Sequence, residues 1–354
     1  MQKDTPSGKA WYGYAGLLLG FILIGYLFSR VDLKSSAALI GSIGYLSILI
    51  PLPYLLLHLL ETAAWKKLFS DSIRQIRFFR LLKIQIVSET VSMTLPAGVA
   101  VGEPLRPYLC RRFMDVPLPA GFASIAVRKL LLGATQGIYT TIGAVTGFSL
   151  LQHSSQGVAG FEGLGVIMVL AGTLVMLFFL FMLALLLNGK AARSLHRLLM
   201  LIPFPRVRQW LLAREEGFTQ TDRELQNLRN TGFAGILPLL AYYTAAWMML
   251  ALESYLILRL LGVHVSFIQV LAFDTALAML RAVFFFVPSG LGIQDLGYLA
   301  FFQALGMHDY LVYGGAFVVL RRLKELVWYA AGYALMFIDG IHLKDAQRVT
   351  EKSE

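Results

Sequence analysis

Two short stretches of the chain repeat one pattern of residues that is suited to holding a charged group. Each has a proline, two small residues and an acid within an apolar run, in the order Pro-x-Gly-x-(Ala/Gly)-x-x-acid. Proline removes a backbone donor and glycine relaxes the backbone, so a helix should stop and restart there. A restarting helix presents free N–H groups and a partial positive charge, which suit an anion such as a phosphate. The residues of the pattern are Pro96, Gly98, Ala100 and Glu103, then Pro288, Gly290, Gly292 and Asp295.

The two stretches are separated by a constant interval. Every residue of the second pattern lies 192 positions after its counterpart, from Pro96 and Pro288 to Glu103 and Asp295. A pair of cations follows each acid at nearly the same distance. Arg128 and Lys129 come 25 and 26 residues after Glu103, and Arg321 and Arg322 come 26 and 27 residues after Asp295. This repetition indicates a duplicated unit that includes both the break and the charges.

Composition indicates that these residues lie in a helical membrane protein. The chain is 57% hydrophobic and 15% charged, whereas soluble domains carry about 25% charged residues. The run 163–187 contains no charge and exceeds the roughly 20 residues that cross a bilayer. No signal peptide is evident, because the apolar run 10–28 is long enough to span and lacks a small-residue cleavage site. The net charge of +10 fits basic loops near anionic lipid rather than nucleic acid.

Several kinds of site are not indicated by the sequence. The single cysteine, Cys110, excludes an internal disulfide. The six histidines show no metal-ligand spacing, and neither a Walker A loop nor a Gly-x-Ser-x-Gly motif is present. We therefore expect no metal and no cofactor.

The apolar runs predict an all-α polytopic membrane protein with six spanning helices and two re-entrant, broken hairpins. The count is eight spans if both hairpins cross fully. The loop 61–83 has six basic residues against two acids, which places it and both termini in the cytosol. Loop 152–162 has no Lys or Arg and fits an external position, and the basic segment 188–230 predicts one or two amphipathic surface helices. The predicted spans are 10–28, 37–60 (bent near Pro51 and Pro53), 119–151, 163–187, 233–261 and 310–338, and the hairpins lie at 84–102 and 267–305.

The duplication divides the chain into five parts. These are an N-terminal span and loop (1–36), a first repeat unit (37–151), a fourth span with a basic loop (152–232), a second repeat unit (233–338) and a cytosolic tail (339–354). The second span runs inward and the fifth runs outward, so the units should have inverted topology. Secondary transporters typically have this arrangement, with a substrate site at the repeat interface beside broken helices.

The charged residues inside apolar sequence allow two interpretations. A cation at mid-membrane costs about 2.5–3.5 kcal/mol, so it should face a partner or a cavity. Either the cations hold a lipid phosphate while the acids balance or gate them, or they form internal ion pairs. Those pairs would join Glu103 to Arg128 or Lys129, and Asp295 to Arg321 or Arg322. The two acids could also simply cap the helices that restart at the breaks.

Four further charged residues lie in apolar sequence. Asp274 and Arg281 are seven apart and hence on one helical face, so we expect them to pair. Glu89 or Glu253 could carry a coupling proton.

The same residues resemble a known family along nearly the whole chain. The sequence is similar to the lysylphosphatidylglycerol synthase transmembrane family, also called flippase-like integral membrane proteins. The resemblance is carried by Leu95–Gly98 with Gly102, Glu103 and Arg106, by Arg128–Lys129, and by Val287–Asp295. Family members commonly have Pro-Gly-Gly-Leu-Gly-x-x-Glu at the last site, where this chain has Ser289 and Asp295. The form FFVPSGLGIQD, with Arg321 and Arg322 nearby, is also similar to the branch associated with hopanoid lipid genes.

The resemblance implies a multi-span fold that handles lipids and, in the best-known members, flips aminoacylated phosphatidylglycerol. Those members carry a soluble aminoacyl-transfer domain after the membrane part. This chain stops at Glu354, so we expect no such domain and no lipid synthesis. We expect a lipid transporter of the bacterial inner membrane rather than an enzyme, with a headgroup held by Arg128, Lys129, Arg321, Arg322, Glu103 and Asp295. The breaks at Pro96–Gly98 and Pro288–Gly292 would supply helix-end donors and hinges.

Two alternatives to transport stay open at this stage. One is a membrane-embedded lipid-modifying transferase that uses Glu103 or Asp295 as its base. The other is a non-catalytic partner in a lipid-synthesis complex. The expected binding partners are anionic or aminoacylated phospholipids or a hopanoid, together with a second copy of the chain or enzymes of lipid synthesis, and no nucleic acid.

Overall fold

The computed structural model of the chain is helical throughout the residues that it describes, which are 18, 22–69, 76–95, 98–188, 194, 215–230, 232–284, 287 and 290–341. The predicted first span at 10–28 and both termini fall largely outside these residues. The helices are α2 (Leu33–Ile43), the 3-10 helix η1 (Gly44–Leu49), α3 (Leu52–Lys66), α4 (Phe78–Thr94), α5 (Gly98–Met114), α6 (Leu118–Thr146), α7 (Phe148–Ala159), α8 (Leu164–Leu187), α11 (Glu215–Asn230), α12 (Gly232–Leu260), α13 (Phe267–Val283), α14 (Ile293–Ala304) and α15 (Tyr310–Ile338).

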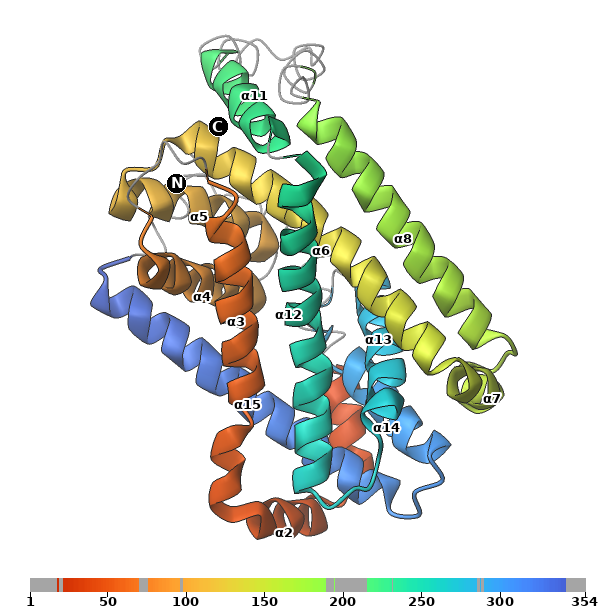
Figure 1. The fold of residues 1–354 in the computed structure, drawn as a ribbon. Helices are drawn as coiled ribbons and strands as arrows, with labels where there is room; N and C mark the ends of the chain where they lie inside the picture. The colour runs from red at the N-terminus through yellow and green to blue at the C-terminus, as the bar shows by residue number, and fades with distance from the viewer. Residues whose placement is uncertain are drawn as a thin grey trace, which may run out of the picture.

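Helix α6 is the central element of the packing, since it contacts α5, α8, α11, α12 and α13 (Figure 1). Its most extensive contact is with α8, and glycine allows the two backbones to approach closely there. A Cβ atom on Gly137 of α6 would collide with the backbone nitrogen of Met176 on α8. Larger residues at this crossing would therefore push α8 away from α6.

Four segments described by the structure are long and apolar enough to cross a membrane. They are Leu33–Lys66, Leu118–Thr146, Leu164–Leu187 and Ala234–Leu260. Helix α15 also has 29 residues, but four charged residues interrupt its apolar sequence. The chain is therefore an all-α membrane protein, as the composition predicted.

The segment Leu33–Lys66 is interrupted near Pro51, as predicted, and also bends at Gly44. Helix α2 and helix α3 run in different directions in Figure 1. Gly44 ends α2 in a positive-φ conformation (φ 58°), which other residues rarely adopt. Pro51 and Pro53 lie at the start of α3, directly after the end of η1, where proline is well tolerated.

The third predicted span is too long, and the loop after it is mostly helix. Helix α6 ends at Thr146, and residues 148–159 form α7, which covers much of the predicted external loop 152–162. Leu151 of α7 is fully buried, because α7 packs on α8, α13 and α14. Burial of this apolar residue stabilises α7 as a separate helix instead of a continuation of α6.

The two predicted breaks both occur and separate pairs of short helices. Helices α4 and α5 flank the first break, and α13 and α14 flank the second. These helices have 17, 17, 17 and 12 residues, which is fewer than the roughly 20 needed to span a bilayer. The amphipathic helix predicted in 188–230 is present as α11, and the rest of that segment lies mainly outside the described residues.

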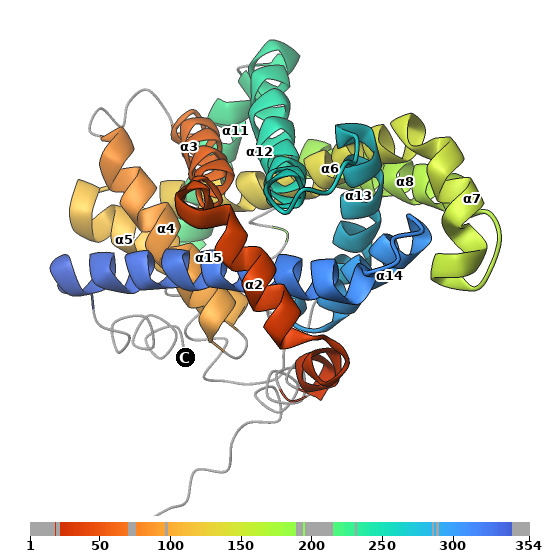
Figure 2. The same ribbon diagram turned by 90° about the horizontal axis from the view of Figure 1, so that it is seen from below.

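The helices that precede and follow the two breaks run in opposite directions, and the two that follow the breaks match in length. Helices α6 and α15 each have 29 residues, and both ends of α15 lie 192 positions after those of α6. In Figure 1, α3 and α12 run in opposite directions, and so do α6 and α15. One hydrophobic core gathers around α3–α6 and a second gathers around α12–α15. Helix α2 crosses α15 in Figure 2, where Ser36 Oγ donates to the Val312 carbonyl at 3.0 Å.

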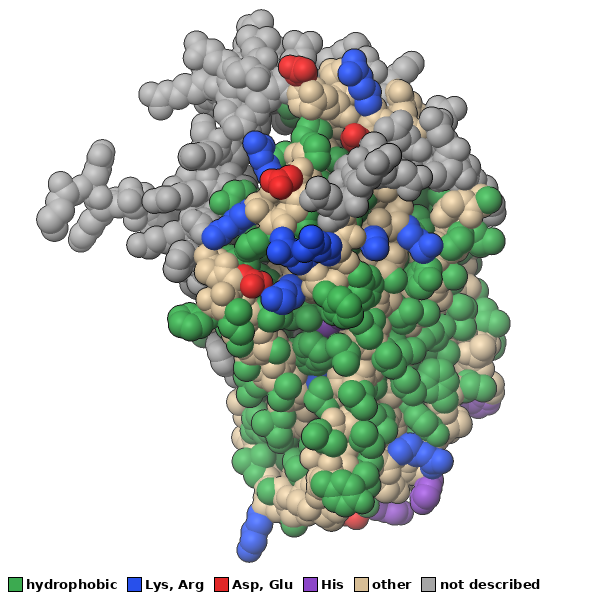
Figure 3. All heavy atoms as spheres, turned by 60° about the vertical axis from the view of Figure 1, so that its left-hand side comes forward, with side chains coloured by type: hydrophobic (Ala, Val, Ile, Leu, Met, Phe, Trp, Pro, Cys, Tyr) green, Lys and Arg blue, Asp and Glu red, His purple; other side chains and the backbone are tan. Residues whose placement is uncertain are grey.

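Charge is unevenly distributed over the surface. On the face drawn in Figure 3, Lys and Arg side chains gather above a broad band of hydrophobic side chains. The last turns of α3 and α5 contribute Lys66, Arg111 and Arg112 to this basic end. The apolar band is the surface that a bilayer would cover.

Candidate functional site: paired charges beside the helix breaks

Glu103, the acid of the first break, joins three helices through ion pairs. Its Oε1 atom lies 2.6 Å from Lys129 Nζ on α6 and 2.5 Å from Arg106 Nη1 on its own helix, α5. Arg106 is fully buried and also donates to Glu89 Oε2 of α4 at 2.9 Å. Arg106 therefore lies between two carboxylates, and it fixes α4 against α5 on either side of the break.

Arg128 precedes Lys129 but binds a different acid. Its Nη2 atom donates to Glu61 Oε2 of α3 at 2.6 Å, and Gln85 Nε2 donates to the same oxygen at 2.6 Å. The Arg128 guanidinium also lies 6.0 Å from the ring centroid of Trp65, within the range of a cation–π contact. Glu61 was not among the residues that we predicted for the site.

Asp295, the acid of the second break, has two roles. Its Oδ2 atom accepts from the backbone N–H of Gly292 at 2.8 Å, which caps the start of α14. The same oxygen lies 2.6 Å from Arg322 Nη2 on α15, and Arg322 Nη1 lies 2.6 Å from Glu325 Oε2. The capping interpretation is confirmed for Asp295 and wrong for Glu103, which lies five residues after the start of α5.

A further ion pair joins α12 and α15. Lys324 Nζ lies 2.9 Å from Glu253 Oε2, and both side chains are buried. The ammonium group also lies 4.1 Å from the ring centroid of Tyr54 on α3. Glu253 and Glu89 thus each have a cationic partner. Protonation of either carboxylate would remove the negative charge that balances that partner.

The two halves of the chain contain ion pairs between corresponding helices, in which the acids, but not the cations, lie 192 positions apart. Glu103–Lys129 joins α5 to α6, and Asp295–Arg322 joins α14 to α15. Glu61–Arg128 joins α3 to α6, and Glu253–Lys324 joins α12 to α15. Glu61 and Glu253 are also 192 positions apart, like the two acids at the breaks. In each half, the helix that follows the break (α6 or α15) is therefore held by one acid at the break and by one acid on the helix that precedes the break (α3 or α12).

Arg321 binds a cluster of hydroxyl groups rather than Asp295. Arg321 Nη1 donates to the Tyr298 hydroxyl, which donates in turn to Asp274 Oδ1 at 2.6 Å. Asp274 also accepts from Tyr139 at 2.7 Å and from Ser254 at 3.0 Å. This buried cluster fixes α6 to four helices of the second half.

The predicted pair of Asp274 and Arg281 is therefore wrong. Asp274 takes its hydrogen bonds from hydroxyl groups, and Arg281 lies beside the second break. Its Cγ and Cδ atoms come within 3.2 Å of the place that a Cβ atom on Gly290 would occupy. Seven residues correspond to roughly 10 Å along a helix, which is far enough for the two side chains to meet different neighbours.

Both acids at the breaks keep one oxygen atom without a partner. Among the described residues, Glu103 Oε2 and Asp295 Oδ1 are buried and have no hydrogen-bond partner. Buried carboxylate oxygens usually accept at least one hydrogen bond. The two ion pairs differ in accessibility, since the Lys129 side chain is 45% exposed and the Arg322 side chain is 17% exposed.

The comparison with protein families identifies the chain. A model of the lysylphosphatidylglycerol synthase TM region matches residues 14–332. The chain belongs to this family. The match confirms the resemblance and supports a lipid-related role in the membrane. It does not distinguish the hopanoid-associated branch, which stays a prediction. Searches of curated proteins and of solved structures found no match.

In this member of the lysylphosphatidylglycerol synthase TM family, the predicted site residues form separate pairs, and their joint action on one headgroup stays a prediction. Lys129 and Arg322 contact the acids at the breaks, whereas Arg128 and Arg321 turn to other partners. Gly98 begins α5, and Gly290 and Gly292 adopt positive φ angles of 61° and 76°. Pro96 and Pro288 lie outside the described residues. Within the described part of the chain, no cluster of His, Cys, Asp and Glu could hold a metal ion.

Sequence reasoning missed Glu61, Tyr298 and Tyr139 as parts of this network. One signal could have found Glu61, because it precedes Glu253 by the same 192 positions that relate the breaks. The two tyrosines carry no comparable signal, since aromatic residues in membrane helices usually serve as core or interface residues.

Proposed function

We propose that the protein moves a lipid with a polar, charged headgroup between the leaflets of the bacterial inner membrane. The supporting observation is that equivalent ion pairs, Glu103–Lys129 and Asp295–Arg322, lie beside the two helix breaks. The proposed architecture is an inverted repeat with six spans and two re-entrant hairpins. The basic end of the molecule faces the cytosol, and so do both termini.

The ion pairs reduce the energy needed to keep charge inside the membrane. An isolated buried cation is strongly unfavourable, and a nearby carboxylate offsets most of that penalty. A lipid phosphate can replace Glu103 beside Lys129, or Asp295 beside Arg322, without leaving the cation unpaired. The acid that is displaced, together with its unpartnered oxygen, can then accept a hydroxyl or ammonium donor of the headgroup. The acyl tails stay in the bilayer during this exchange.

Two equivalent pairs allow the headgroup to move in steps. The pair Glu103–Lys129 is the more exposed and receives the headgroup first, while Asp295–Arg322 holds the other side closed. Arg128 and Arg321 stay in their buried contacts and supply positive charge behind the two exchanging cations. Opening of the second pair at its break then releases the headgroup to the opposite leaflet.

A reconstituted transport assay tests this proposal. Purified protein in liposomes with headgroup-labelled phospholipids is exposed to a membrane-impermeant quencher, and the loss of protected label is followed over time. We expect faster loss than in empty liposomes. Lys129→Gln and Arg322→Gln should each slow transport by roughly ten-fold, which corresponds to about 1.4 kcal/mol in the barrier.

Matched variants distinguish the site from a general effect of charge. Lys66→Gln and Arg111→Gln remove exposed cations at the basic end and should transport like wild type. If folded wild-type protein accelerates transport of none of a broad lipid panel, the proposal fails. Chemical analysis of the lipids after the assay addresses the transferase alternative, because a transporter leaves its lipid unchanged.

A further inference from the structure

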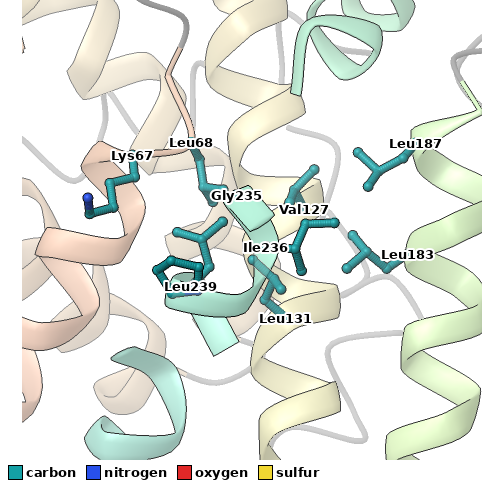
Figure 4. A pocket seen from close by; sticks show the side chains of 10 residues that line it. Lys67, Leu68, Val127, Leu131, Leu183, Leu187, Gly235, Ile236 and Leu239 are labelled. Carbon is teal, nitrogen blue, oxygen red and sulfur yellow. The ribbon is translucent and has the colours of Figure 1, made fainter. Parts of the chain in front are cut away.

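An apolar pocket lies apart from the paired charges, between α3, α6, α8 and α12. Its volume is about 220 Å³, and aliphatic side chains form most of its wall. Figure 4 shows side chains of α6, α8 and α12 that converge on it. These include Val127, Leu131, Leu183, Leu187, Ile236 and Leu239.

The pocket lies near the ends of three helices that are long and apolar enough to span. Helix α8 ends at Leu187, and α12 begins at Gly232, so the lining residues Leu183 and Ile236 lie within about one turn of those ends. Helix α3 ends at Lys66, directly before the pocket residue Lys67. The pocket therefore lies at one boundary between the hydrocarbon core and the headgroup region.

A cation marks the outer edge of the pocket. Lys67 is exposed and lies at the α3 edge in Figure 4. Its ammonium group lies 5.9 Å from the ring centroid of Tyr242. Lys66, the preceding residue, is a second exposed cation, and basic residues at a membrane boundary attract anionic lipid headgroups.

These features match one kind of occupant. Apolar cavities of about 150 Å³ in proteins stay free of water and take up apolar molecules. A sugar, nucleotide or peptide would leave its polar groups without hydrogen bonds against the aliphatic wall, which is unfavourable. A phospholipid matches both the aliphatic wall and the cation, because its acyl chain can pack on the wall and its phosphate can pair with Lys67.

We propose that this pocket holds the acyl chain of a resident anionic phospholipid whose phosphate lies beside Lys67. The lipid enters from the leaflet at the basic end and fills the space between α6, α8 and α12. This site is separate from the proposed transport path, since none of the residues of the two ion pairs at the breaks lines the pocket. The inference does not depend on whether the protein transports lipid.

Native mass spectrometry of the purified protein with added phosphatidylglycerol or phosphatidylcholine tests the site. Ile236→Phe fills the pocket and should remove one bound phosphatidylglycerol per chain. Lys67→Gln should weaken retention of phosphatidylglycerol by about five-fold and leave retention of phosphatidylcholine unchanged.

Two control variants are matched to these changes. Leu237→Phe alters the next residue of α12, which is exposed and does not line the pocket, and Lys66→Gln removes the neighbouring exposed cation. Both should retain phosphatidylglycerol like wild type. Equal retention by wild type, Ile236→Phe and Lys67→Gln would overturn the proposal, as would equally strong retention of phosphatidylcholine by wild type. Because Lys67 is exposed, we expect Lys67→Gln to fold. It therefore tests whether the site prefers an anionic headgroup even if Ile236→Phe does not fold.

Discussion

At the scale of single residues, two cations of the network, Arg106 and Arg322, each balance two carboxylates. Arg106 is the clearest case, because it is fully buried between Glu89 and Glu103. Removal of one partner from a buried ion pair is much more destabilising than replacement of the whole pair, since the remaining charge stays desolvated. The network is therefore sensitive to changes that leave a charge behind.

Arg106→Met should destabilise the protein by about 3–5 kcal/mol, because it leaves two carboxylates without their buried cation. Thermal unfolding in detergent measures the change. Arg111→Met is the matched control, since Arg111 is an exposed cation on the same helix, and it should unfold like wild type. Equal unfolding temperatures for the two variants would contradict this role of Arg106.

Tyr298→Phe should lower the stability by about 1–3 kcal/mol. The substitution keeps the ring but removes the hydroxyl that donates to Asp274 and accepts from Arg321, so two buried groups lose a partner. Unfolding in detergent again provides the measurement. Tyr255→Phe should have no comparable effect, because Tyr255 is only partly buried and its ring packs on Phe267 and Arg259. A neutral Tyr298→Phe would show that the hydroxyl cluster adds little to stability.

The sequence predicted that the acids at the breaks would pair with the cations that follow them, but not which cation each would choose. Neighbouring residues of a helix point about 100° apart, so Arg128 and Lys129 cannot both face α5. The choice depends on where α3 and α5 pack around α6, and the spacing of charges contains no information about that packing. The same reason applies to Arg321 and Arg322.

At the scale of elements, the helix breaks that proline and glycine produce were predictable from sequence. Proline and glycine in mid-run gave the positions of both breaks and of the half-helix α14. Helix α7 and the bend at Gly44 were missed, because burial of Leu151 depends on tertiary packing. A lone glycine in an apolar run is usually tolerated inside a helix and gives only a weak signal of a bend.

Gly292→Ala should destabilise the second break by about 1–2 kcal/mol. Gly292 precedes α14 with φ 76°, a conformation in which a Cβ atom meets the backbone. Gly41→Ala is the control, since Gly41 lies inside α2 with open space around it and an alanine there should stabilise by up to about 1 kcal/mol. Opposite shifts in unfolding temperature are expected. A stabilising Gly292→Ala would mean that the break does not require this backbone conformation.

At the scale of the whole molecule, one interval in the sequence relates two sets of helices. The 192-residue spacing predicted the duplication, and the equal lengths and bounds of α6 and α15 match it. The spacing could not predict that Lys129 is more exposed than Arg322, because exposure depends on how the neighbouring helices pack. Under the proposed function, we expect the more exposed pair, Glu103–Lys129, to meet the headgroup first.

The orientation of the molecule can be tested by labelling single cysteines in cells. Cys110 is fully buried, so Cys110→Ala provides a background without a reactive thiol. Lys66 ends α3 at the basic end, and His308 lies between α14 and α15 at the opposite end (Figure 1). Both are exposed. A membrane-impermeant maleimide should label His308→Cys in spheroplasts and should label Lys66→Cys only after the membrane is opened, because basic segments stay in the cytosol.

The reverse pattern of labelling would place the basic end outside and would contradict the proposed topology. Labelling of both cysteines in sealed spheroplasts would put the end of α3 and the start of α15 on the same side of the membrane and would also contradict the proposed topology. The labelling result also fixes the leaflet of the apolar pocket, since Lys67 directly follows Lys66. If Lys66→Cys is protected in sealed spheroplasts, the anionic lipid beside Lys67 must enter from the cytosolic leaflet, where anionic headgroups give the stronger negative surface potential.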